Sequence, residues 1–214
     1  MNQLVVMIVP LLFSVAFHEV AHGYVALLRG DNTAKMAGRL TLNPIKHLDF
    51  FGSLLLPLIL KLTGSPIIFG YAKPVPVNFS NLKDVRKSTI LVASAGVLVN
   101  FMLAVVSGIL FQILTRHQSA WQTTIFGPII TDLYFMLYYS VIINLILAIF
   151  NLIPVPPLDG SKILAMILPP SLRMQFARLE RFGMIIIIFL LLTNVLDRLL
   201  SFFLTPMLNI LLGR

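Results

Sequence analysis

The sequence predicts an all-α polytopic membrane protein, and this prediction rests on the composition and on several long apolar segments. Of the 214 residues, 58% are hydrophobic and only 11% are charged, whereas soluble domains carry roughly 25% charged residues. The mean hydropathy is +0.94. A soluble core of this size needs much less apolar surface, so the excess is expected to face lipid.

Four apolar segments are long enough to cross a hydrocarbon core of about 30 Å as helices. They are residues 4–28, 88–115, 128–153 and 183–212. The first is not expected to be a cleaved signal peptide, because no Lys or Arg precedes it and it is too long for the apolar part of one. The fourth is interrupted by Asp197–Arg198 and by Pro206, which predicts a kinked or interfacial outer half.

The apolar stretch 50–60 is too short to span, since a spanning helix needs roughly 17–25 residues. If this stretch dips into the membrane and returns, the basic loops 29–49, 61–87 and 154–182 all fall on one side. The positive-inside rule makes that side cytoplasmic. We therefore predict a re-entrant or interfacial segment, four spans and both termini outside.

Two stretches of the same cytoplasmic face have the composition of extended chain. Residues 35–43 alternate in part between polar and apolar side chains, and residues 66–79 are rich in proline, β-branched and aromatic residues. Pro74 and Pro76 stand at alternate positions, which suits an edge strand. The sequence thus predicts a small β element at the membrane surface, within a single integral-membrane domain of residues 1–214.

The first predicted span contains His18-Glu19-Val20-Ala21-His22, an H-E-x-x-H pattern. Residues four apart lie on one face of a helix, so both imidazoles can reach one Zn²⁺ at about 2.0–2.1 Å. Glu19 can take the proton of a water on the metal. A polar cluster satisfied by neighbouring helices is the alternative, although a glutamate at membrane depth is costly unless it is paired or functional.

A catalytic zinc needs a third protein ligand, which cannot be a cysteine because the chain has none. Two ways in which soluble metalloproteases supply the third ligand are excluded. An H-x-x-G-x-x-H extension would need Gly and His where the chain has Val25 and Leu28, and a downstream glutamate ligand would have to be Glu180, the only other glutamate. The remaining candidates are His47, Asp31, Asp49, Asp132 and Asp159. Asp159 is favoured, because it follows the third span and a proline-rich break, at the membrane depth expected for the two histidines.

Two motifs together resemble the site-2 protease family of intramembrane zinc metalloproteases (M50 type), namely HEVAH in the first span and NLIPVPPLDG after the third. The stretches GRLTLNPIKHLD and FGYAKPVPVN are similar to its compact bacterial and archaeal branch, which lacks regulatory domains. The resemblance therefore implies a prokaryotic inner membrane, and the predicted topology places the active site towards the cytoplasm. The resemblance implies that His18, His22 and Asp159 bind one zinc ion and that Glu19 is the catalytic base. It also implies cleavage of transmembrane protein substrates, with Asn151 helping to stabilise the oxyanion.

The second predicted span contains a stretch with several small residues, Ser94-Ala-Gly96-Val97-Leu-Val-Asn100. It resembles the corresponding stretch of the family, although Val97 stands where a proline is usual. Ser94 and Gly96 predict a close approach of two helices, and Asn100 predicts a hydrogen bond across the interface. For Asn151, a helix–helix hydrogen bond is the alternative to the oxyanion role.

Two other classes of function compete with proteolysis. A membrane metal transporter or metal sensor could use the same His/His/Asp site, but a transport path favours several ion-binding groups along the membrane. The net charge of +8 could suggest nucleic acid, yet no basic stretch is interleaved with aromatic residues as a stacking platform would need. The lysines and arginines are expected to contact the lipid bilayer instead.

Overall fold

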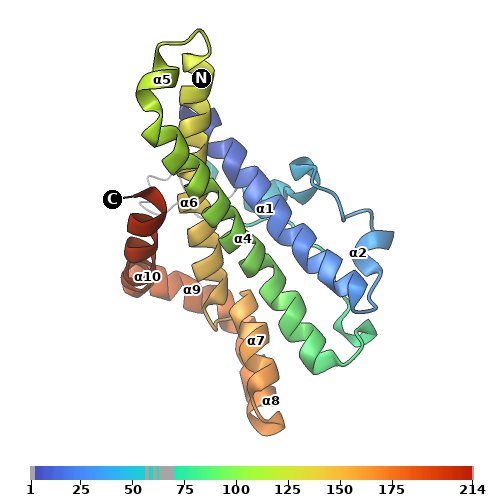
Figure 1. Ribbon diagram of the computed structural model, residues 1–214. Helices are drawn as coiled ribbons and strands as arrows, with labels where there is room; N and C mark the ends of the chain where they lie inside the picture. Colours follow the sequence, from blue (N-terminus) through green and yellow to red (C-terminus); the bar gives the residue numbers. More distant parts are fainter. Residues whose placement is uncertain (1–2, 56–57, 60–61, 63–69, 214) are drawn as a thin grey trace.

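The computed structural model describes residues 3–55, 58–59, 62 and 70–213, and all regular structure in this part of the chain is helical. The longest helices are α1 (Gln3–Leu28), α4 (Val85–Arg116) and α6 (Gly127–Leu152) (Figure 1). The shorter elements are α2 (Thr33–Met36), η1 (Pro44–His47), η2 (Phe50–Leu55), η3 (Phe79–Asn81), α5 (Gln118–Gln122), α7 (Asp159–Ile167), α8 (Pro170–Arg178), η4 (Leu179–Phe182), α9 (Gly183–Leu192) and α10 (Val195–Leu212).

Four of the described helices, α1, α4, α6 and α10, are long and apolar enough to cross a membrane. The first three agree with the predicted segments to within three residues at each end. Only 11–33% of the residues in the apolar windows of the four helices are buried inside the protein. Their apolar side chains therefore face lipid, and the prediction of an all-α integral membrane protein is confirmed.

The fourth predicted span, 183–212, is divided into α9 and α10, which meet at Thr193 and Asn194. Asn194 has a φ of 55°, a left-handed conformation that asparagine adopts at the ends of helices. The predicted interruption is thus present, but its predicted position is wrong. Asp197 lies in the first turn of α10, where a negative charge is favourable, and Pro206 lies inside the helix.

Helix α4 is the centre of the bundle, because it packs against α1 and α6 and also contacts α7 and α10 (Figure 1). Its C-terminal half joins α6 and α10 in an apolar core that includes Phe111, Val141 and Leu145. The N-terminus and α5 lie at one end of the bundle, and α2, α7 and α8 lie towards the other (Figure 1). This arrangement places α4 against both α1 and α7.

The predicted β element is not found among the described residues. Residues 35–43 and 70–79 contain no strand, and residues 66–69 lie outside the described part of the chain. The first stretch begins inside α2 and then turns at Gly38, whose φ of 63° is readily adopted only by glycine. The alternating pattern therefore ends before a strand can form.

The second stretch includes a loop, residues 73–78. Its backbone N–H groups donate to carboxylate side chains and to a backbone carbonyl, and not to the carbonyls of a neighbouring strand. Proline has no N–H, so the loop has no donor at positions 74 and 76. The N–H of Lys73 donates to the carbonyl of His47 at 2.9 Å. The N–H of Val75 donates to the carboxylate of Glu19 at 2.7 Å, and the N–H of Asn78 donates to the carboxylate of Asp31 at 2.8 Å.

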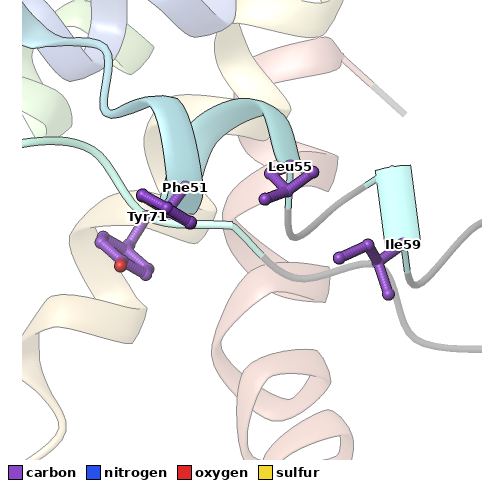
Figure 2. A pocket seen from close by; sticks show the side chains of 4 residues that line it. All are labelled: Phe51, Leu55, Ile59 and Tyr71. Carbon is purple, nitrogen blue, oxygen red and sulfur yellow. The ribbon is translucent and has the colours of Figure 1, made fainter.

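The predicted re-entrant or interfacial segment, 50–60, gains no support from the residues that are described. Residues 56, 57 and 60 lie outside them, and Phe50–Leu55 is a short π-helix, η2. Asp49 begins this helix, since its carboxylate accepts the N–H of Gly52 at 2.7 Å. Figure 2 shows a pocket beside η2, lined by Phe51, Leu55, Ile59 and Tyr71.

Asp31 is fully buried just beyond α1 and joins that helix end to the surrounding loops. Its carboxylate accepts two hydrogen bonds from Thr33, one from the side chain of Asn81 and one from the backbone of Asn78. Burial raises the pKa of the Asp31 carboxyl, but the hydrogen bonds from Thr33, Asn81 and Asn78 outweigh it and lower the pKa below its ordinary value. Asp31 is therefore a structural carboxylate.

We expect Asp31→Ala to lower the free energy of unfolding by about 2–4 kcal/mol, because several donors lose a charged acceptor. Because the folded-state pKa is lowered, this stabilisation is present above the unfolded pKa of about 3.9. It is lost as the pH falls through the lower folded value. Unfolding in detergent at neutral and acid pH measures both effects. Exposed Lys87→Ala is the control, and an Asp31→Ala chain as stable as that control would contradict the prediction.

Candidate metal centre

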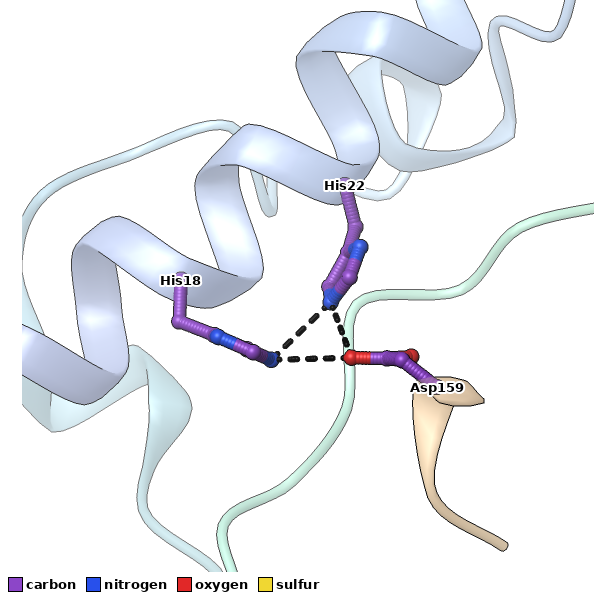
Figure 3. Close-up of side chains that lie close together, drawn as sticks. All are labelled: His18, His22 and Asp159. Carbon is purple, nitrogen blue, oxygen red and sulfur yellow. Dashed lines mark hydrogen bonds and ion pairs between the residues drawn. The ribbon is translucent and has the colours of Figure 1, made fainter. Parts of the chain in front are cut away.

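Three buried side chains from two helices converge at the C-terminal half of α1. His18 and His22 point from one face of that helix towards Asp159, the first residue of α7 (Figure 3). The Nε2 atoms of His18 and His22 lie 3.2 and 3.0 Å from Oδ2 of Asp159, and 3.0 Å from each other. Two imidazole nitrogens and one carboxylate oxygen thus face a common point.

The spacing of these three atoms fits a transition-metal ion. Ligand atoms held at about 2.0–2.1 Å in a tetrahedral zinc site lie roughly 3.3 Å apart, close to the observed 3.0–3.2 Å. Two histidines and one carboxylate suit zinc and leave a fourth position for water or substrate. The cluster could therefore hold a metal ion.

The other candidates for a third ligand lie elsewhere, since the described residues contain only one such group of metal-ligating side chains, formed with Asp159. His47 is buried in η1, with its Nε2 atom 2.7 Å from the carbonyl of Thr41. Asp31 accepts hydrogen bonds from Thr33, Asn78 and Asn81, and Asp49 accepts the N–H of Gly52. Asp132 lies in the first turns of α6, at the end of the bundle near α5.

Helix α4 orients both imidazoles through their second nitrogen atoms. The Nδ1 atom of His18 lies 2.7 Å from Oδ1 of Asn100, and that of His22 lies 2.6 Å from the carbonyl oxygen of Val92. A carbonyl oxygen can only accept, so Nδ1 of His22 carries its proton and Nε2 keeps a lone pair for a metal. The predicted hydrogen bond of Asn100 across the interface is confirmed, whereas its partner His18 was not anticipated.

Gly96 of α4 lies directly against the two imidazoles. A Cβ atom at this position would be 2.5 Å from Nε2 of His22 and 2.6 Å from Cε1 of His18. Real Cβ atoms essentially never come closer than 3.0 Å to other heavy atoms. The predicted close helix approach at Gly96 is confirmed, and the atoms that approach are those of the candidate ligands.

Asp159 is held by Lys162, one turn further along α7. The Lys162 ammonium lies 3.0 Å from Oδ1 of Asp159, so that Oδ2 is the oxygen directed to the histidines. Burial raises the pKa of the Asp159 carboxyl, but pairing with His18 and His22 and the charge of Lys162 lower it well below its usual range. Asp159 therefore stays ionised. An i,i+3 pair in the sequence was the available signal for Lys162.

Two further predicted site residues make other contacts in this structure. Glu19 follows His18 on α1, and its Oε2 accepts the backbone N–H of Val75 in the 73–78 loop at 2.7 Å. Asn151 lies in the last turn of α6, and its amide donates to the carbonyl of Leu147 in the same helix at 2.9 Å. Neither of these hydrogen bonds involves the three clustered side chains.

Comparison with known proteins agrees with this geometry. The family model described as "Peptidase family M50" matches residues 6–194. A Bacillus subtilis protein named "Putative zinc metalloprotease YwhC" is 38% identical over 203 residues, which cover 95% of this chain and 85% of that protein. Two proteins named "Putative zinc metalloprotease Rip2" are each 29% identical to the chain. The alignment with the Mycolicibacterium smegmatis protein covers 87% of this chain and 66% of that protein. The alignment with the Mycobacterium tuberculosis protein covers 90% of this chain and 69% of that protein. No solved structure matches the chain.

Proposed function

Because the chain belongs to peptidase family M50, we propose that it is an intramembrane zinc metalloendopeptidase that cleaves membrane proteins in or near their transmembrane segments. The observation that carries this proposal is the meeting of His18, His22 and Asp159 at 3.0–3.2 Å within a bundle of apolar helices. These three residues would hold one Zn²⁺. Relatives named as zinc metalloproteases support the choice of metal and of reaction.

The zinc would polarise the scissile carbonyl and lower the pKa of a bound water towards about 7. Glu19 is the general base in this proposal and takes the proton of the attacking water before passing it to the leaving amine. Its Oε2 is held by the N–H of Val75, and we assign proton transfer to the second oxygen. Asn151 would stabilise the oxyanion with its side-chain amide after leaving the Leu147 carbonyl.

The basic loops support an orientation with the site towards the cytoplasm. The segments with several Lys and Arg residues, 29–49, 70–87 and 162–181, adjoin the end of the bundle where α2, α7 and α8 lie. The linker near α5 contains only Arg116. By the positive-inside rule, this distribution favours an active site on the cytoplasmic side. The bacterial relatives favour a prokaryotic inner membrane, and we treat residues 1–214 as one domain.

Metal removal tests the proposal directly. We expect purified chain in lipid vesicles to cleave single-span membrane proteins, to lose this activity on treatment with a zinc chelator and to regain it with added Zn²⁺. Mass spectrometry of the fragments locates the cut. A zinc-loaded chain that cleaves no member of a broad substrate panel but carries Zn²⁺ across the vesicle membrane would instead identify a transporter.

A further inference from the structure

A line of buried polar side chains runs from His18 between α4 and α6. Asn100 of α4 lies 2.7 Å from Nδ1 of His18, and its amide nitrogen donates to Oδ1 of Asn144 on α6 at 3.0 Å. Asn144 in turn donates to the backbone carbonyl of Ser140 at 2.9 Å and to its hydroxyl at 3.1 Å. Asn100 and Asn144 are 0% and 1% exposed. Because they are shielded from bulk solvent, their amide groups need hydrogen-bond partners within the protein.

The direction of these hydrogen bonds is determined at the Ser140 end. The Ser140 carbonyl can only accept, so the Asn144 amide must turn its NH₂ group to that carbonyl and its oxygen to Asn100. Asn100 must then present its own NH₂ group to Asn144 and its oxygen to His18. An oxygen acceptor at this distance requires the proton of His18 on Nδ1, which leaves the lone pair on Nε2.

We infer that Asn100 and Asn144 are positioning residues that hold His18 in the tautomer and orientation required to bind the metal. This inference rests on the proposed function, since it assigns a role towards the zinc ligands. We call the series of hydrogen bonds from Ser140 through Asn144 and Asn100 to His18 the relay. His22 needs no relay, because its Nδ1 bonds directly to the Val92 backbone carbonyl. The backbone therefore orients His22, whereas the side chains of Asn100 and Asn144, which can be changed by mutation, orient His18.

If the relay orients His18, substitutions in it should change the orientation or tautomer of His18, which substitutions at a purely structural position would not do. Leucine at position 100 removes the acceptor and lets His18 rotate or carry its proton on Nε2. Aspartate at position 100 can only accept, so it keeps the proton of His18 on Nδ1, although it adds a charge and loses the N–H that Asn100 donates to Asn144. Leucine at position 144 leaves the contact between Asn100 and His18 possible, but lets the Asn100 amide turn over. Ser107→Ala removes a 2.8 Å hydrogen bond to Ser140 in the same interface without affecting the orientation of either amide.

Zinc affinity is the decisive measurement, made on the full chain in detergent by competition between Zn²⁺ and a fluorescent chelator. Asn100→Leu is expected to weaken Zn²⁺ binding by about 10- to 100-fold, the range found for residues that orient metal ligands. Asn144→Leu is expected to weaken it in the same direction but less, while Asn100→Asp and Ser107→Ala keep near-wild-type affinity. The unfolding midpoint of each metal-free variant separates effects on zinc from effects on folding.

Four outcomes would overturn the inference. Zinc affinity of Asn100→Leu equal to that of Ser107→Ala would show that the hydrogen bond to His18 does not matter, and equal weakening in Asn100→Leu and Asn100→Asp would exclude the acceptor role. If Asn100→Leu does not fold, unchanged zinc affinity in Asn144→Leu overturns the relay. Failure of the wild-type chain to bind Zn²⁺ would overturn the proposed function as well, which distinguishes this outcome from the other three.

Discussion

Glu19→Gln is expected to slow peptide hydrolysis by about 10²–10⁴-fold while the protein keeps its zinc, because a glutamine amide cannot act as a general base. Glutamine has nearly the shape of glutamate, and its side-chain oxygen can still accept the N–H of Val75, as Glu19 does at 2.7 Å. The variant therefore changes the proton chemistry with little change to the fold. Cleavage rate and zinc content measured on the same preparation test the prediction.

Glu180→Gln is the matched control, because it makes the same chemical change at an exposed residue of η4. It should retain both cleavage and zinc. Glu19→Ala adds a second comparison, since it also removes the hydrogen bond that holds the 73–78 loop. Wild-type cleavage by Glu19→Gln would exclude Glu19 as the base, and loss of zinc in that variant would make Glu19 a ligand instead.

The helical fold could be predicted because hydropathy and segment length are properties of the chain itself. A stretch of more than twenty apolar residues has to be a helix in lipid, where every backbone polar group needs a partner within the segment. The surface loops lack this constraint. The residues around Pro74 and Pro76 have strand-like composition, but the side chains of Glu19 and Asp31, distant in sequence, accept the N–H groups that a strand would have used.

The candidate metal centre could be predicted for a similar reason. Helical periodicity places His18 and His22 on one face, and the topology brings the residue after the third span to the same depth. The supporting residues depend on contacts that no local pattern contains. Asn100 bonds a histidine 82 positions earlier in the chain, and the importance of Gly96 becomes visible only when α4 is packed against α1.

Gly96→Ala is expected to lower zinc affinity by about a hundredfold or more, the upper end of the effects of residues that orient ligands. The added Cβ would lie 2.5 Å from Nε2 of His22 and 2.7 Å from Nδ1 of His18, while ordinary contacts are 3.4–4 Å. The imidazoles or the two helices must therefore move by nearly 1 Å. Distances in a zinc site agree with the usual values to about 0.2 Å, so a shift of this size distorts the arrangement of the ligands.

Gly108→Ala provides the control on the same helix, about three turns further along. Its Cβ would meet Leu211 of α10 at 3.0 Å, so it strains helix packing without approaching a candidate ligand. We expect this variant to lose some stability and to bind zinc like the wild type. If Gly96→Ala and Gly108→Ala shift the unfolding midpoint alike and both keep full zinc affinity, close packing at Gly96 serves only the fold. Selective loss of zinc in Gly96→Ala would show that α4 must approach α1 this closely for His18 and His22 to bind the metal.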